Sequence, residues 1–162
     1  QKATGMDTFD FVYHELLQPI GVWSIRWAKD PNGVFFGGAG MYITPRDMAR
    51  FGYLYLHHGK LQGKQILDSD WIKQSVTNHR HYTSKWKEMK EVGYGYLWWT
   101  GKLRGYPVYF ASGFAGQWIL VIPDVNMIIV TTMMDFTEKE GIQMESLITI
   151  VHDYILPAVN DK

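Results

Sequence analysis

Apolar positions recur at helical spacing in the first half of the chain, between stretches rich in turn residues. After Asp7, a candidate N-cap, the apolar side chains follow the i, i+3, i+4 pattern and predict a helix; they are Phe9, Val12, Tyr13, Leu16 and Leu17. The letters "QPIG" end this helix. Residues 22–40 contain Asp-Pro-Asn-Gly and three further glycines, and they predict a loop.

The clearest helix lies in "ITPRDMARFGYLYLHHGK". Thr44 is the predicted N-cap, and Pro45 occupies the first turn, where its missing N–H costs nothing. Asp47 favours the positive end of the helix dipole, and Gly59 is the predicted C′ residue. We expect the buried stripe of this helix to consist of Met48, Phe51, Gly52 and Tyr55.

A shorter helix is predicted from Asp68 to about Val76, followed by an exposed, lysine-rich loop over residues 79–91. From Gly93 onward the pattern changes to short apolar runs between turn residues. The runs "YGYLWWTG", "YPVYFAS", "GQWILVIP" and "NMIIVTTMM" predict four strands, and the short turns between them make the strands antiparallel. Two runs do not alternate and predict strands covered on both faces, Trp118–Ile122 and Met127–Val130.

A last helix is predicted to cover this sheet. Its apolar stripe is Met144, Leu147, Ile148, Val151, Tyr154, Ile155 and Ala158. Helices, antiparallel strands and a final helix follow one another along the chain, so the predicted fold class is α+β, an antiparallel sheet covered by helices.

Composition narrows the class of protein. The chain has 162 residues, the size of one domain, and 46% of them are apolar, which excludes a disordered chain. The 16 basic and 16 acidic side chains cancel, which argues against nucleic-acid binding. Without cysteine, disulfides and cysteine nucleophiles are excluded. No apolar run approaches the roughly 18–20 residues that span a bilayer.

The stretch Tyr109–Pro123, "YFASGFAGQWILVIP", carries the residues that point to chemistry. A Ser-Gly step and a second glycine separate two apolar runs, which is typical of a turn that another group approaches closely. The alternative is a tight hairpin with glycines at positive φ. Ser112 lies in no G-x-S-x-G, which excludes the nucleophile elbow of α/β-hydrolases. Trp98 either lines a cleft or packs in the core, and core packing is the default interpretation.

Other candidate motifs carry less. Ser84 to Lys87 match S-x-x-K, but no apolar stripe follows and the lysines stay hydrated, so we interpret the match as chance. The histidine pairs His57 and His58, and His79 and His81, have no carboxylate at i+4 and no convergent third ligand. We interpret them as surface residues rather than metal ligands.

Three segments in order resemble one family. They are "GGAGMYITPRDMARFGYLYLHHGKLQGKQIL", "GYGYLWW" and "YFASGFAGQWILVIPDVNMIIV". Together they are similar to the C-terminal part of the β-lactamase-related serine hydrolases, which include class C β-lactamases, D-Ala-D-Ala peptidases and esterases. The resemblance extends over nearly the whole chain. It implies that residues 1–162 are the C-terminal portion of one domain with a β-lactamase/DD-peptidase-like fold.

The resemblance also implies roles for four residues. The family uses S-x-x-K for the nucleophile and its lysine, Y-x-N for a second proton-handling group, and K-T-G on a strand edging the site. Ala111, Ser112 and Gly113 match the K-T-G positions. The Ser112 hydroxyl is then expected to bind a substrate carboxylate or assist proton transfer, Gly113 to let substrate pack against backbone, and the Phe114 N–H to form half of an oxyanion hole.

The chain contains neither a working S-x-x-K nor a Y-x-N, because none of its ten tyrosines has Asn two residues on. It also opens without Met or a signal peptide, so we expect the nucleophile in a missing N-terminal segment and the isolated chain to be inactive. Two departures weaken a β-lactamase assignment. Ala111 removes the cation of K-T-G, and Ala39 stands where class C enzymes carry a tyrosine. Both departures favour an esterase, amidase or peptidase.

The expected function is therefore that of a fragment of a serine hydrolase, acting through an acyl-enzyme on an ester, amide or β-lactam/peptide bond. The alternative is a non-catalytic binding or scaffolding module, and a third possibility is a chain proteolysed from an intact enzyme. Expected partners are a small acyl substrate and the missing segment, and the surfaces it leaves exposed favour self-association. The resemblance implies no metal or organic cofactor, and exported bacterial relatives suggest a periplasmic or secreted location.

Overall fold

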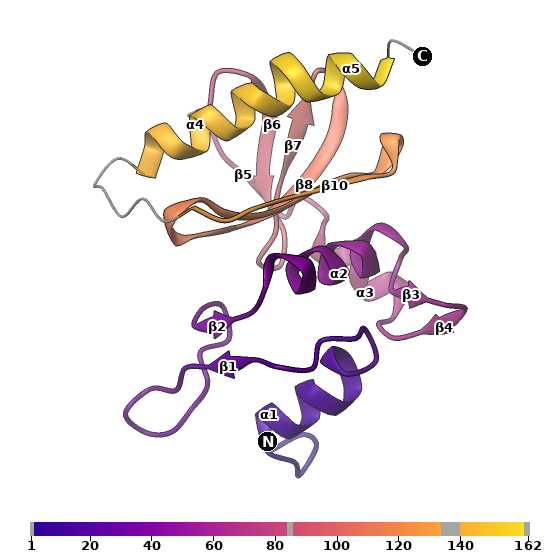
Figure 1. The fold of residues 1–162 in the computed structure, drawn as a ribbon, viewed down its shortest axis with the longest axis vertical. Coiled ribbons are helices and arrows are strands. Elements are labelled where there is room, and N and C mark those ends of the chain that lie inside the picture. The colour runs from indigo at the N-terminus through magenta and orange to yellow at the C-terminus, as the bar shows by residue number, and fades with distance from the viewer. Residues whose placement is uncertain (1, 84–85, 134–139, 161–162) are drawn as a thin grey trace. The chain divides into compact units, whose positions relative to one another are not determined.

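The structure, a computed structural model, describes residues 2–83, 86–133 and 140–160. They form two compact units, with the boundary between Ile72 and Lys73. The first unit combines helices with two small two-stranded ribbons, and the second is built on a six-stranded sheet (Figure 1). Helices together with an antiparallel sheet confirm the α+β class.

The first unit contains three α-helices and four short strands among its described residues. In chain order its elements are α1 (Thr8–Val12), the π-helical turn η1 (Tyr13–Leu17), β1 (Arg26–Trp27), β2 (Met41–Tyr42), α2 (Pro45–Leu56), β3 (Lys60–Leu61), β4 (Lys64–Gln65) and α3 (Ser69–Ser75), which crosses the boundary.

The predicted N-cap Asp7 is confirmed, and Asp68 caps the helix predicted to start there. The side chain of Asp7 accepts a hydrogen bond from the N–H of Phe9 over 2.8 Å at the start of α1. Asp68 does the same for the N–H of Trp71 over 2.9 Å and opens α3. These carboxylates satisfy N–H groups that have no partner within the helix, which explains why the helices begin where they do.

Thr44 caps α2 as predicted. Its hydroxyl accepts from the N–H of Asp47 over 3.2 Å and donates to the carboxylate of Asp47 over 2.7 Å. Arg50, one turn further on, forms an ion pair with the same carboxylate. Asp47 is only 7% exposed, and these partners explain how its charge is accommodated.

The C-terminal end of α2 corrects the prediction for Gly59. His58, with φ of +53°, occupies the left-handed C′ position instead. The N–H of Gly59 bonds to the carbonyl of Leu54 over 2.8 Å, the closing hydrogen bond of a Schellman motif. Gly59 is still constrained, because its φ is +81° and an added Cβ would lie 2.0 Å from the carbonyl oxygen of Leu67.

The core of the first unit forms where α2 meets the end of η1. Of the predicted stripe, Met48, Gly52 and Tyr55 are buried, whereas Phe51 is half-buried. The most deeply buried residue of α2 is Leu54, which the stripe omitted. It packs in a cluster with Leu17, Ile20 and Val22.

Residues 22–40 are not wholly a loop. Arg26 and Trp27 of β1 pair in antiparallel register with Tyr42 and Met41 of β2. The Trp27 ring contacts the ring of Phe35, with centroids 4.9 Å apart. Aromatic contacts stabilise this ribbon despite its length of two residues per strand.

The second unit is one antiparallel sheet in which every strand pairs with its neighbour in sequence, in the order β10-β9-β8-β7-β6-β5. The strands are β5 (Arg80–His81), β6 (Met89–Tyr94), β7 (Trp99–Leu103), β8 (Tyr106–Gly113), β9 (Gln117–Ile122) and β10 (Met127–Thr131). The last three confirm predicted strands.

The start of the sheet corrects two predictions. Residues 79–91 are not simply an exposed loop, because they contain β5 and the beginning of β6, and Met89 is completely buried. The predicted strand "YGYLWWTG" is instead the end of β6, a four-residue turn and the beginning of β7. The turn is closed by a hydrogen bond from the N–H of Gly95 to the carbonyl of Trp98 over 2.8 Å, and Leu97 within it has φ of +63°.

The prediction of strands covered on both faces holds fully for one of the two runs. All five residues of Trp118–Ile122 are buried. The residues of Met127–Val130 are half-buried, because β10 is the last strand of the sheet and has a strand neighbour on one side only among the described residues.

The C-terminal helices cover one face of the sheet (Figure 1), as predicted. They are α4 (Glu140–Ile150), the π-helical turn η4 (Val151–Ile155) and α5 (Leu156–Asn160). The π-turn rotates the apolar stripe, because each of its hydrogen bonds spans five residues instead of four. Consequently Leu156 is fully buried in the core, while the predicted stripe residues Tyr154, 72% exposed, and Ala158 face solvent.

Candidate functional site

The last three residues of β8 are paired with a strand on one side, and no described strand pairs with them on the other side. Ala111, Ser112 and Gly113 pair with β9. The pairing of β8 with β7 stops at Phe110, opposite Trp99, where the chain enters the turn before β7. Within the described part of the chain, no strand therefore pairs with residues 111–113 on the β7 side. Unpaired strand edges of this kind are where an extended peptide can add a strand.

Strand alternation divides the side chains of this edge between the two faces of the sheet. Ser112 lies directly opposite Trp118, and Trp118 belongs to the core that α4 covers. Ala111 and Gly113 consequently lie on the other face. Ser112 and Gly113 are exposed and Ala111 is half-buried, so all three are accessible from solvent.

The turn that follows β8 has an unusual backbone. It consists of η2 (Phe114–Gly116), and both Ala115 and Gly116 adopt left-handed conformations, with φ of +55° and +71°. Ala115 is 2% exposed, whereas the Phe114 ring is 63% exposed. The expected glycine at positive φ is thus Gly116, and Gly113 is extended with φ of −104°.

Two residues that sequence reasoning missed hold this turn. The hydroxyl of Thr131, at the end of β10, donates to the carbonyl of Gly116 over 2.8 Å. The side chain of Met133 lies against Gly116, where an added Cβ would be 2.8 Å from the Met133 sulfur. Neither residue belongs to a recognisable motif, because the contacts join positions at least fifteen residues apart.

The two remaining predicted site residues lie elsewhere. Trp98 is 3% exposed and packs edge-on against the ring of Tyr109, with centroids 5.4 Å apart, which supports its default interpretation as a core residue in this chain. Ala39 is exposed in the first unit, and its carbonyl accepts a hydrogen bond from the indole N–H of Trp27 over 3.3 Å.

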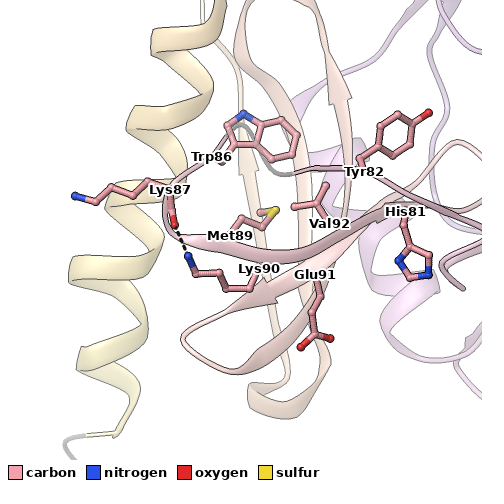
Figure 2. A pocket seen from close by; sticks show the side chains of 8 residues that line it. All are labelled: His81, Tyr82, Trp86, Lys87, Met89, Lys90, Glu91 and Val92. Carbon is pink, nitrogen blue, oxygen red and sulfur yellow. Dashed lines mark hydrogen bonds between the residues drawn. The ribbon is translucent and has the colours of Figure 1, made fainter.

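A hollow of about 450 Å³ lies beside β5 and β6 and includes none of the predicted site residues. Figure 2 shows that its polar side chains do not converge. The ammonium group of Lys87 and the carboxylate of Glu91 point in different directions. The ammonium group of Lys90 donates a hydrogen bond to the backbone carbonyl of Lys87 over 3.0 Å. The full lining is His81, Tyr82, Trp86, Lys87, Met89, Lys90, Glu91 and Val92.

The histidines singled out by the sequence have partners of other kinds. His57 contacts the Tyr53 ring, with centroids 4.0 Å apart, and His79 stacks on Tyr96. A ring nitrogen of His81 lies 3.0 Å from the Asn78 amide nitrogen. Among the described residues, no three His, Cys, Asp or Glu side chains gather as a metal site would require, and no helix is both long and apolar enough to cross a membrane. The S-x-x-K match includes Ser84 and Lys85, outside the described residues.

Comparison with known proteins gives a consistent picture. A family model described as "Beta-lactamase" matches residues 1–152. An uncharacterized protein of Alkalihalophilus pseudofirmus is 26% identical in an alignment 151 positions long that covers 80% of this chain and 42% of that protein.

Two solved structures share the fold. A Bacillus anthracis protein provisionally named a 6-aminohexanoate-dimer hydrolase matches 98% of this chain and 41% of its own, with a TM-score of 0.74 and 25% identity. A Bacteroides dorei protein provisionally named a beta-lactamase matches 88% of this chain and 51% of its own, with a TM-score of 0.55 and 12% identity. The chain spans about two-fifths of the length of the Alkalihalophilus pseudofirmus and Bacillus anthracis proteins.

Proposed function

Because the chain belongs to the Beta-lactamase family, we propose that it supplies one wall of the acyl-transfer site of a longer serine hydrolase. The wall consists of Ala111, Ser112, Gly113 and the backbone N–H of Phe114. The observation that carries the proposal is the strand edge at residues 111–113, which is accessible, paired with β9 alone among the described strands, and continued by a turn with a fixed backbone.

The proposed reaction proceeds through an acyl-enzyme. A serine hydroxyl from the remainder of the longer protein attacks a carbonyl carbon, and a lysine and a tyrosine of the same remainder move the protons. The carbonyl oxygen gains negative charge in the tetrahedral intermediate, and the Phe114 N–H donates a hydrogen bond to it. Expulsion of the amine or alcohol leaves an ester on the serine, and water hydrolyses this ester.

Edge-on binding would give the substrate its orientation. An extended substrate segment beside residues 111–113 would form backbone hydrogen bonds in the manner of an added strand. Gly113 would leave space for that approach, and Ser112 would offer a hydroxyl at the flank. Ala111 provides no cation for a carboxylate, which favours a linear ester or amide over a β-lactam. The Bacillus anthracis neighbour is provisionally named a 6-aminohexanoate-dimer hydrolase, and two amino acids joined through their amino and carboxyl groups form an amide, in agreement with this preference.

Labelling by a fluorophosphonate tests the proposal. We expect the complete protein to be labelled at one serine outside this chain, and the isolated chain not to be labelled. Replacing Phe114 by phenyllactic acid exchanges its N–H for an ester oxygen and keeps the side chain, and we expect labelling to slow by about 100-fold or more. Unchanged labelling of this variant would exclude the oxyanion role.

The competing function is a non-catalytic binding or scaffolding module that retains the fold. It predicts a complete protein that no fluorophosphonate labels. We further propose that the isolated chain self-associates through the edge of β10, which has apolar side chains and no strand beyond it among the described residues. Light scattering of the isolated chain against the complete protein tests this.

A further inference from the structure

A residue of β10 forms a hydrogen bond to the turn between β8 and β9. Thr131 lies at the end of β10, directly opposite Trp118 of β9. Its half-buried hydroxyl reaches past this pair to the carbonyl of Gly116 and donates to it over 2.8 Å. The hydrogen bond therefore fixes the peptide group that leaves the turn, on the side away from the free strand edge.

The turn requires such support because its backbone is strained. Two successive residues in the left-handed conformation raise the conformational energy of the turn, and for Ala115 the steric strain is greater than it would be for glycine. The buried methyl group of Ala115 and the contact between Gly116 and Met133 restrict the alternatives. If the Gly116 carbonyl were released, the peptide groups of the turn would rotate toward less strained conformations, and the N–H at its start would change direction.

We infer that Thr131 is a positioning residue for the oxyanion hole, acting through the Gly116 carbonyl on the direction of the Phe114 N–H. The inference rests on the proposed function. An oxyanion donor must point at the site where charge develops, so a change in direction lowers the rate of acylation more than it lowers substrate binding. Thr131 itself contacts neither substrate nor nucleophile in this scheme.

Three variants of the complete protein test the inference. Thr131→Val removes the hydroxyl and keeps the branched shape, Thr131→Ser keeps the hydroxyl, and Thr132→Val changes an exposed neighbour as a matched control. A fluorophosphonate titrated at several concentrations separates the binding constant of the probe from the first-order rate constant of acylation. Hydrogen exchange of the peptide covering residues 114–116 reports on the turn itself.

For Thr131→Val we expect acylation to slow by about tenfold, less than the loss of about 100-fold for removing a donor. The binding constant should change by less than about twofold, and exchange of the turn should accelerate. Thr131→Ser and Thr132→Val should behave as the wild type.

Acylation of Thr131→Val at the wild-type rate would overturn the inference, whatever happens to its melting temperature. An equal loss in Thr131→Ser would also overturn it, because the hydroxyl would then be irrelevant. If the wild-type complete protein is not labelled at all, the proposed function itself is wrong and this inference is rejected with it. Labelled wild type together with fully active Thr131→Val rejects the inference alone.

Discussion

The side chain of Asn78 occupies the space that any side chain at Gly93 would need. A Cβ built on Gly93 would lie 2.0 Å from both Cγ and Nδ2 of Asn78. Gly93 stands opposite Thr100 in the pairing of β6 with β7, at the point where the register shifts. The absence of a side chain at position 93 therefore lets the segment before β5 pack directly on the sheet.

This relationship predicts a coupled pair of substitutions. Gly93→Ala should lower the free energy of unfolding by about 1–3 kcal/mol, because the core is overpacked at this point. Adding Asn78→Ala should restore part of the loss, since the colliding amide is removed. Urea denaturation of the four proteins of the cycle measures the coupling. Gly37→Ala is the control, because an added Cβ there has no atom within 4 Å, and additive effects at 93 and 78 would contradict the packing.

The cap of α2 gives a second prediction. Thr44→Ala removes the hydroxyl that exchanges hydrogen bonds with Asp47 and should cost about 1 kcal/mol. Thr44→Ser keeps the hydroxyl and should cost much less. Thermal unfolding followed by circular dichroism distinguishes the two, and equal losses in both variants would show that the methyl group matters instead.

Leu97 offers a stabilising substitution. It has φ of +63° in the turn between β6 and β7, and its side chain is 60% exposed. Leu97→Asn should raise stability by a few tenths to about 1 kcal/mol, because Asn tolerates the left-handed conformation better. Leu97→Ala keeps the steric penalty and serves as the control. The midpoint of urea unfolding is the measurement, and an equal rise in both variants would point to lost surface hydrophobicity.

The π-turn at residues 151–155 predicts opposite outcomes for two neighbouring positions. Leu156→Ala should destabilise by about 2–5 kcal/mol, because Leu156 is completely buried. Tyr154→Lys should change stability by less than about 0.5 kcal/mol, because the ring faces solvent. A regular α-helix through this segment would reverse the order, so the two unfolding midpoints decide between the registers.

For Ser112, a single substitution can distinguish the two predicted roles of the hydroxyl, substrate binding and proton transfer. If its hydroxyl binds substrate, Ser112→Ala in the complete protein should raise KM about 2–10-fold and leave kcat nearly unchanged. If it transfers a proton, kcat should fall by about 100-fold or more. We expect the binding role, since the proposed reaction assigns proton transfer to a lysine and a tyrosine of the remainder of the longer protein. Steady-state kinetics with an activated ester decides.

Local features of the fold are predictable from the sequence because their causes are local. The caps at Asp7, Thr44 and Asp68 depend on side chains within three residues of the groups that they satisfy. The apolar runs of β8 and β9 likewise identify their own strands. These segments need no knowledge of distant neighbours, and the structure places them where the patterns predict.

Features that depend on distant packing escape the sequence. Trp86 and Met89 stand among lysines in a segment whose pattern predicts a loop, yet both pack on the core of the second unit, where Met89 stands opposite Leu103 of β7. Tyr154 is exposed and Leu156 is buried, the reverse of the predicted pattern, because of a π-helical turn that no residue type in the sequence indicates. The strand edge at residues 111–113 was predicted from the family pattern, whereas Thr131, which supports the turn beyond it, is fifteen residues from its partner Gly116.

The order of the sheet has a consequence for how the protein is made. Each of its six strands pairs with the strand before or after it in the chain, so the sheet can assemble by successive closure of neighbouring hairpins. Such short-range closure is fast, because little chain entropy is lost before the first contacts form. During synthesis on the ribosome, the strands would emerge in the same order in which they pair.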